Sequence, residues 1–406
     1  MVPRPNRPSD GRRRRDLLRY GAATLAASAA GCLSGLPPLG RRQSYGRVDA
    51  PPASEPVYRR WLPDPALLDG GGAHYAFAAG EPAPIDGGEP EEFLGRRAFA
   101  KTDLDHFGVG YAAYDRFVDC PFGTVIEAGA DAATVADALT GSGYDPDGSY
   151  RGYDLFARAD VPRRAAIRDG VVVWSCETRH EQPDVEALVD AGAGEVRRYH
   201  EASDSFARLS ETIGGGRMLI AGPAIGDPTD RAELGADTFR FVDDAAYQVV
   251  ALRFPAARVP TADELRRAFR DEYGLTQEAD AFDVRVEGRT GLLETRVPLG
   301  ESRDLDALAD PPQVTWGAAF DPDARQLTLR HEAGDPVDAD LLWFDAETGA
   351  HNGIEKESLF ADRTRVGPGD ADVVDLAGRP DVVEANVVLA PAPCCDFRVL
   401  FDYELE

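Results

Sequence analysis

Hydrophobic positions in the middle of the chain alternate between the two-residue period of strands and the longer period of amphipathic helices. The predicted strands between residues 117 and 222 are 122–128, 152–157, 165–167, 171–174 and 218–220. The predicted helices carry their apolar residues at Val135, Ala136 and Leu139, at Val185, Leu188 and Val189, and at Phe206, Leu209 and Ile213. Asp131 is a suitable N-cap for the first helix, and Gly141 a suitable end.

The order of these elements predicts an α+β fold. Strand, helix, two strands, helix and strand is the ferredoxin-like βαββαβ arrangement, in which one sheet carries its helices on one face. Arg168-Asp169-Gly170 either joins two of the strands as a hairpin or forms a bulge within one longer strand. The whole body is expected over 57–302, although 57–116 show no clean period and their fold is left open.

Residues 238–302 repeat part of this order. The repeated elements are a strand at 247–254, a capping box at 261–264 that opens a helix, and paired strands at 282–286 and 292–297. Two interpretations stay open. Either the body is a duplication with halves 117–222 and 238–302, or the agreement is chance, because β-α-β-β is a common local order.

The pattern changes after Pro311-Pro312. Helical spacing ends, and short alternating runs follow at 314–320, 326–330, 341–344, 382–389 and 397–403. Spaced strands of this kind predict an immunoglobulin-like β-sandwich over 303–406. The segment 327–341, which begins Leu-Thr-Leu-Arg-His-Glu, resembles the head domain of haloarchaeal pilin-type surface proteins. The resemblance implies a surface β-sandwich without an activity, and the long apolar assembly helix of a pilin is absent from the sequence.

The net charge of the chain indicates the environment in which this protein is found. The 406 residues include 71 Asp and Glu against 44 Lys and Arg, for a formal charge of −27, and only Lys101 and Lys356 are lysines. Such a charge opposes phosphate contacts and excludes a nucleic-acid binder of the usual kind. Self-repulsion of this size is tolerated where salt screens it. The composition resembles haloarchaeal proteins; an acidic protein from a GC-rich genome is the alternative.

The first residues are typical of an export signal. Four arginines precede a short apolar run, and Arg14 and Arg15 lie where the pair stands in a twin-arginine motif, which this segment resembles. Ala29-Ala30-Gly31-Cys32 resembles a lipobox, which implies that Cys32 becomes the lipidated first mature residue; simple cleavage with a free Cys32 is the alternative. We therefore expect a signal peptide at 1–31 and a proline-rich tether at 32–56. Lipid would then anchor the protein to the outer face of the membrane.

Four further cysteines follow Cys32. Cys120 precedes the first predicted strand of the body and Cys176 ends the third, and the ferredoxin-like arrangement makes these strands neighbours. We therefore predict a Cys120–Cys176 disulfide, with two buried free thiols as the alternative. Adjacent Cys394 and Cys395 have three open interpretations: a strained disulfide, a soft-metal site, or one buried and one exposed thiol.

The sequence has no motif that assigns a reaction. It lacks Gly-x-Ser-x-Gly and the phosphate-binding glycine patterns, and its six histidines are scattered singly. Asp103, Asp105 and His106 are close enough in sequence to contact one cation, but acidic surfaces produce such clusters freely. No catalytic, cofactor or metal residues are therefore assigned. A non-catalytic surface protein that binds a ligand or another protein, or supports the envelope, is the favoured function, and an extracellular hydrolase or a solute or metal receptor the alternative.

Overall fold

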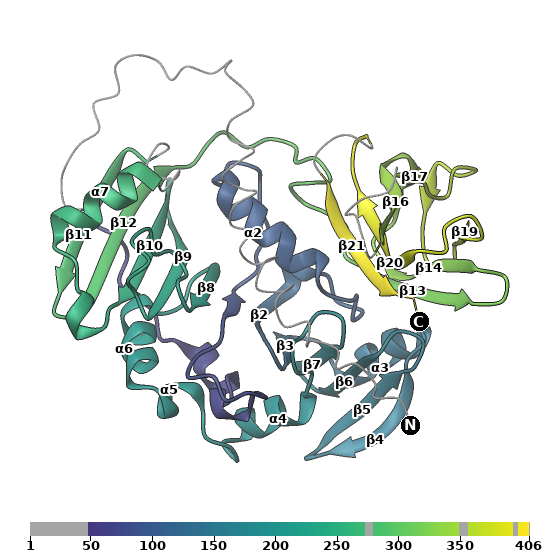
Figure 1. Cartoon of the computed structure of the whole chain (residues 1–406), viewed down its shortest axis with the longest axis horizontal. Coiled ribbons are helices and arrows are strands. Elements are labelled where there is room, and N and C mark those ends of the chain that lie inside the picture. Colours follow the sequence, from purple (N-terminus) through teal and green to yellow (C-terminus); the bar gives the residue numbers. More distant parts are fainter. Residues whose placement is uncertain (1–47, 273–278, 349–355, 393–396, 406) are drawn as a thin grey trace, which may run out of the picture.

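The computed structural model describes residues 48–272, 279–348, 356–392 and 397–405, without the side chains of residues 272 and 348. Two β-rich bodies lie side by side, a long sheet with helices and a smaller C-terminal sandwich (Figure 1). This agrees with the α+β class. The predicted residues Arg14, Arg15, Cys32, Cys394 and Cys395 lie outside the described residues.

One antiparallel sheet organises the described part of residues 48–298. Its twelve strands follow the order β11-β12-β10-β9-β8-β1-β2-β3-β7-β6-β5-β4. They are β1 (Phe77–Gly80), β2 (Tyr114–Cys120), β3 (Gly123–Ala128), β4 (Asp145–Tyr150), β5 (Tyr153–Arg158), β6 (Arg163–Arg168), β7 (Val171–Cys176), β8 (Met218–Gly222), β9 (Leu234–Val242), β10 (Ala245–Arg253), β11 (Ala281–Glu287) and β12 (Thr290–Pro298). The hairpin expected at 168–170 is confirmed by the β6–β7 pairing.

Helices cover both faces of this sheet, whereas the sequence predicts them on one. Neighbouring residues on a strand point to opposite faces, and in β3 both Val125 and Ile126 are buried, in different apolar clusters. On one face lie α2 (Glu91–Thr102), α3 (Ala132–Gly141) and α7 (Ala262–Glu272), and on the other lie η1 (Val57–Trp61), α4 (Val185–Ala193), α5 (Tyr199–Ala202) and α6 (Asp204–Ile213). Strands that are apolar on both faces need cover on both, which explains the difference.

The two halves of the sheet have matching strand orders. In one half, the β2–β3 hairpin, α3 and the β6–β7 hairpin are arranged as β2-β3-β7-β6. In the other, the β9–β10 hairpin, α7 and the β11–β12 hairpin are arranged as β9-β10-β12-β11. Strands β8 and β1 join the halves at the centre. Residues 57–116, left open by the sequence, supply η1, β1 and α2 and part of β2.

The described part of the C-terminal body has a three-stranded, a four-stranded and a two-stranded antiparallel sheet around one apolar cluster, which contains Trp316, Leu329, Phe344 and Val387. Its strands are β13 (Val314–Asp321), β14 (Gln326–Gly334), β15 (Val337–Asp338), β16 (Leu342–Thr348), β17 (Glu357–Ser358), β18 (Arg365–Val366), β19 (Ala371–Asp375), β20 (Val382–Leu389) and β21 (Arg398–Glu404). Short 3-10 turns are η2 (Pro65–Leu67), η3 (Tyr111–Ala113), η4 (Ala256–Arg258) and η6 (Ala339–Leu341). None of the described helices combines the length and apolarity required to cross a bilayer.

Cys120 and Cys176, which the sequence predicts to form a disulfide, are both buried and are not bonded to each other in the structure. β3 and β7 are neighbours, as expected, but Cys120 ends β2, and β3 lies between β2 and β7. The two thiols also point to opposite faces, because Cys120 packs with α4 and Cys176 with α3. Cys120 Sγ instead lies 3.6 Å from the Gly123 carbonyl oxygen, and Cys176 Sγ lies 3.2 Å from the Thr178 hydroxyl. The sequence did not predict β2, the strand that carries Cys120.

Candidate functional site

Three of the buried charged side chains of the described residues, Asp105, Arg158 and Arg163, lie where the sheet body meets the sandwich. From the sheet body come the segment 103–110 after α2 and the turn 158–163 between β5 and β6. From the sandwich come residues 313–316 at the start of β13 and residues 330–332 of β14. Val161, in the β5–β6 turn, is 1% exposed and packs into the apolar cluster of the sandwich. We call this region the junction.

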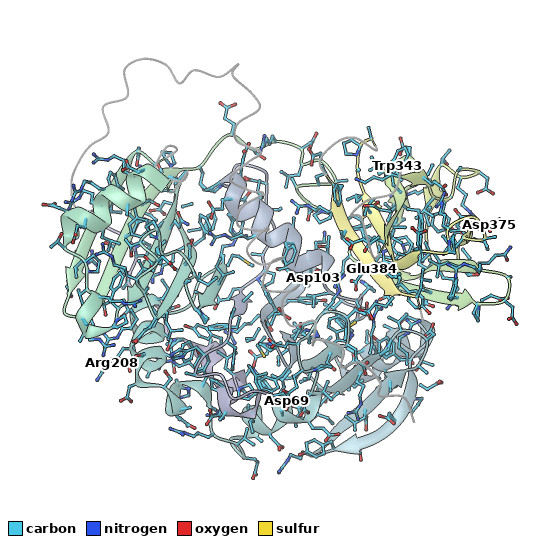
Figure 2. All side chains as sticks on the ribbon, in the orientation of Figure 1. Asp69, Asp103, Arg208, Trp343, Asp375 and Glu384 are labelled. Atoms are coloured by element: carbon cyan, nitrogen blue, oxygen red, sulfur yellow. The ribbon has the colours of Figure 1, made fainter. Side chains whose placement is uncertain are left out.

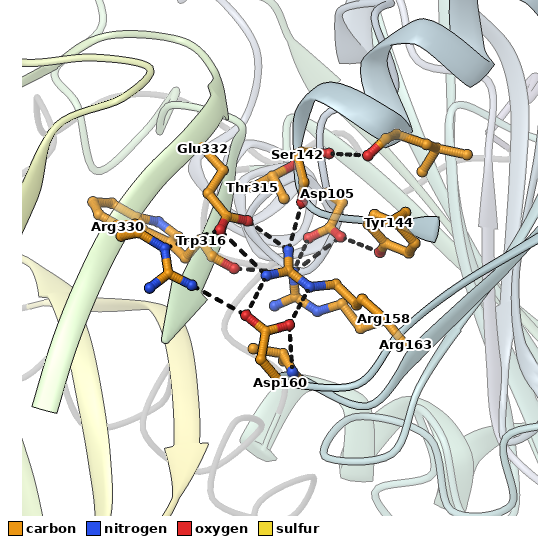
Figure 3. Close-up of polar contacts among 12 residues, drawn as sticks. Asp105, Ser142, Tyr144, Arg158, Asp160, Arg163, Thr315, Trp316, Arg330 and Glu332 are labelled. Atoms are coloured by element: carbon orange, nitrogen blue, oxygen red, sulfur yellow. Dashed lines mark hydrogen bonds and ion pairs between the residues drawn. The ribbon is translucent and has the colours of Figure 1, made fainter. Parts of the chain in front are cut away.

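A buried ion pair lies at the centre of the junction. Arg163 Nη1 donates to both carboxylate oxygens of Asp105, at 2.7 and 3.0 Å, and to the carbonyl oxygen of Trp316 in the sandwich at 3.2 Å (Figure 3). The side chains are only 4% and 5% exposed. Charges removed from water in this way are costly unless each is paired and hydrogen-bonded. The pair therefore depends on the closed junction that surrounds it.

Hydrogen bonds extend this pair into the sheet body. The Tyr144 hydroxyl donates to Asp105 Oδ2 at 2.6 Å, and Trp174 Nε1 donates to the Tyr144 hydroxyl at 2.9 Å. Burial, together with the charge of Asp105, raises the pKa of Tyr144 well above its usual range, so the hydroxyl remains a donor. Burial by itself lowers the pKa of Arg163, but the Asp105 carboxylate outweighs it and raises that pKa. Tyr144 therefore stays neutral and Arg163 stays charged.

A second arginine connects the two bodies directly. The side chain of Arg158 is 1% exposed and donates to Asp160 at 2.9 and 2.8 Å, to Glu332 of the sandwich at 2.5 Å, and to the Ser142 carbonyl oxygen at 2.8 Å. Arg330 of β14 closes the cluster from the other side, with Asp160 at 3.1 Å and Glu332 at 3.3 Å (Figure 3). Arg158 and Arg330, one from each body, therefore share the same two carboxylates, Asp160 and Glu332.

Neutral side chains complete the connection. Gln313 Nε2 donates to the Asp105 carbonyl oxygen and to the Tyr114 hydroxyl, both at 2.8 Å, and its Oε1 accepts from the Tyr111 amide at 3.0 Å. The backbone amide of His106 donates to the Thr315 hydroxyl at 2.8 Å. Gln313 is 1% exposed and uses both ends of its amide across the junction.

Residues of α2 and the segment after it add ion pairs at the border. Arg97 and Lys101 both donate to Asp310, at 2.8 and 3.0 Å, on the connection between β12 and β13. Arg179 contacts Asp103 and lies 3.7 Å from Asp402 of β21. Figure 2 shows Asp103 between the two bodies. Asp103, Asp105 and His106, considered together from the sequence, thus make three separate contacts in place of one cation site.

The sequence did not single out Arg158, Arg163, Gln313 or Glu332. One signal was present: Arg163 lies two residues before Ala165, so both point to the same face of β6, which is buried against Trp174 and Cys176. An arginine on a buried face needs a carboxylate partner. Its partner, Asp105, is 58 residues away, and sequence periodicity cannot pair residues over that distance.

A separate cavity of about 350 Å³ lies in the sandwich, between β16, β17 and β19. Phe344, Leu359 and Val374 line its apolar part, and its carboxylates are Glu357, Asp362, Asp372 and Asp375. Asp372 already accepts hydrogen bonds from the amides of Phe360 and Val373, and Glu357 contacts Arg379. Within the described ranges, no group of three or more His, Cys, Asp or Glu residues is arranged to hold a metal ion.

Comparisons with known proteins assign no family. No family model and no curated protein matches this chain. Two solved structures, titled as crystal forms I and III of TP0453, match with TM-scores of 0.37 and 0.35 at 9% and 10% identity. Each match covers 58% of this chain and 92% or 94% of the other. Similarity at this level is too low to assign a shared fold or function.

Removing one partner of the central pair is expected to destabilise the protein strongly. Asp105→Asn leaves the Arg163 charge buried without its counterion, and we expect the free energy of unfolding to fall by about 3–5 kcal/mol. Chemical denaturation in molar KCl measures the change. The double variant Asp105→Asn/Arg163→Met should recover part of the loss, because no buried charge then remains unpaired.

Glu211→Gln is the matched control. It removes the carboxylate of the Arg208–Glu211 pair on α6, whose side chains are 70% and 52% exposed, and should change the free energy of unfolding by less than about 1 kcal/mol. Arg208 lies at the end of the sheet body away from the sandwich (Figure 2). Equal effects of Asp105→Asn and Glu211→Gln would contradict the central role of the buried pair.

Proposed function

We propose that this chain is an exported, lipid-anchored surface protein of a high-salt organism, with a non-catalytic role in binding or in envelope structure. The observation that carries the proposal is the segment with Arg14, Arg15 and Cys32, in the order of a twin-arginine motif, an apolar run and a lipobox. The charge of −27 supports a location in concentrated salt. The twin-arginine route carries folded proteins, which suits a chain that folds in a salty cytoplasm.

Residues 48–56 of the tether predicted over 32–56 lie within the described structure, and several of them contact the sheet body. Val48 is 5% exposed, and the Pro51 carbonyl oxygen accepts a hydrogen bond from Arg240 of β9 at 2.6 Å. The Ser54 hydroxyl accepts from the Gly215 amide at 3.2 Å. Residues 48–54 are thus attached to the sheet body, and an anchor at Cys32 would pull on the rigid sheet through them.

The finer fold assignment belongs to the same proposal. The matching orders β2-β3-β7-β6 and β9-β10-β12-β11 support a duplication of a hairpin–helix–hairpin unit. The predicted ferredoxin-like order is retained in the first unit if β1 and β2 are taken as insertions between β8 and β3. The sandwich would correspond to the pilin-type head domain and, for a display role, would be the part farthest in sequence from the anchor.

The junction supports a structural use of the buried charges. Arg158, Arg163 and Asp105 all have carboxylate or guanidinium partners and further hydrogen bonds. These contacts fix the sandwich on the sheet body, as a surface display protein requires. An acid or base catalyst instead needs a group that is free to exchange its proton with a substrate.

Localisation tests the anchor directly. In the native host, Arg14→Lys/Arg15→Lys should leave the unprocessed precursor in the cytosol, because the export receptor reads the arginine pair. Cys32→Ser should still be exported but should pass from the membrane fraction to the medium, because no lipid is attached. Cys120→Ser is the matched control and should remain membrane-bound. Unprocessed wild-type protein in the cytosol would contradict the proposal.

The 350 Å³ cavity favours a second candidate, a receptor for a cationic solute, since four carboxylates line it. A thermal-shift screen of the mature protein in molar KCl separates the two. For a display or structural protein, amines, metal ions and sugars should leave the melting temperature unchanged. A compound present at about 100 times its dissociation constant stabilises a protein by about 2.7 kcal/mol, so specific binding would be visible. A clear shift with one compound class would favour the receptor.

A further inference from the structure

Two histidines from different bodies lie near each other at the junction, close enough for one to affect the pKa of the other. His106 belongs to the segment 103–110 of the sheet body, and His331 belongs to β14 of the sandwich. His106 packs closely on β14, because a Cβ atom built on Gly334 would lie 3.1 Å from the His106 Cβ. Gly334 has a φ of +104°, so glycine is required there for a second reason. The contact leaves little space for rearrangement in the closed junction.

Both imidazole rings have one nitrogen without a partner. His331 is 0% exposed, and its Nε2 lies 2.8 Å from the Asp335 carbonyl oxygen, which makes Nε2 the protonated nitrogen of the neutral ring. Among the described residues, neither His331 Nδ1 nor His106 Nδ1 has a hydrogen-bond partner, and both atoms are buried. A proton added at either Nδ1 would therefore create a buried N–H group with no acceptor.

The surrounding groups do not compensate for such a charge. Asp335 faces both histidines from the β14–β15 turn, and Asp105 faces His106 from its own segment but is bound to Arg163. Asp370 faces His331 from the β18–β19 turn and is bound to Arg363 at 2.6 Å. From β13, Trp316 presents its ring edge-to-face at 5.4 Å from the His331 ring, and Thr315 binds the His106 amide.

Burial has the largest effect on the pKa of both histidines. It lowers the pKa of both histidines below the ordinary 6.5, even though Asp335 acts in the opposite direction on each. For His106, the nearby His331 lowers the pKa further. A group whose pKa is lower in the closed state stabilises that state fully above its ordinary pKa. This stabilisation is lost as the pH falls from 6.5 toward the lowered value.

We propose that His106 and His331 together form an acid-sensitive latch between the sheet body and the sandwich. Protonation of the two rings favours a state in which the segment 103–110 separates from β14 and both rings reach water. Arg158 outweighs burial and holds the pKa of Asp160 below 3.8, as Arg97 and Lys101 do for Asp310. The latch therefore loosens before those carboxylates titrate.

Amide hydrogen exchange of the full mature protein in molar KCl tests the latch. The His106 and Tyr111 amides donate across the junction to Thr315 and Gln313 and report on its opening. In the open state each histidine has its ordinary pKa and takes up a proton at about pH 5.5. Each protonation raises the equilibrium constant for opening the junction by up to about tenfold, so the two together raise it by up to about 100-fold. Protection of these amides, corrected for the intrinsic rate, should fall by up to that factor from about pH 7.5 to about pH 5.5. Amides of β3 should keep their protection.

His106→Gln/His331→Gln should remove this loss of protection, because glutamine stays neutral. His74→Gln/His200→Gln is the matched control: burial also lowers the pKa of these histidines, but they lie near α5, and their removal should leave the loss intact. If the first double variant does not fold, His106→Gln alone should reduce the factor to about tenfold. The proposal is overturned if the wild type keeps its protection, or if a folded His106 variant loses as much as the wild type.

Discussion

The Arg163–Asp105 pair is the interaction on which the arrangement of the two bodies depends. Both side chains are nearly inaccessible to water, and a carbonyl oxygen of the sandwich accepts a further hydrogen bond from the guanidinium. Buried charges of this kind stabilise only the arrangement that satisfies them, because any displacement leaves a charge unpaired. Near this pair, Arg158 and Gln313 also form hydrogen bonds between the two bodies, Arg158 with Glu332 and Gln313 with the Asp105 carbonyl oxygen. The sandwich is thereby held in one position on the sheet body.

Periodicity could predict those elements whose residues face one continuous apolar layer. β3, α3, α4 and β7, and the sandwich strands β13, β14, β16, β20 and β21, follow local patterns, and the sequence identified them. It missed α2, the sheet strands β1, β2, β4 and β9, and the sandwich strands β15, β17, β18 and β19. α2 carries its charged and apolar residues in a mixed pattern because Arg96 and Arg97 point into buried ion pairs. Such a helix has no clean stripe, since its polar residues are also buried.

The junction could not be predicted because its pairs join residues far apart in the chain. Arg158 and Glu332 are separated by 174 residues, and Gln313 and Asp105 by 208. The missed β2 strand had the same consequence for Cys120, since one added strand moved its thiol away from Cys176. The functional proposal, by contrast, depends on the first 32 residues, where short motifs suffice and tertiary contacts are not involved.

The central claim is that buried charges make the sheet body and the sandwich one cooperative unit. Scanning calorimetry of the mature protein in molar KCl tests it most directly. We expect the wild type to unfold in one transition. In a junction variant such as Arg158→Met, we expect the sheet body and the sandwich to unfold in separate transitions. Two independent transitions in the wild type, unchanged by that substitution, would contradict it.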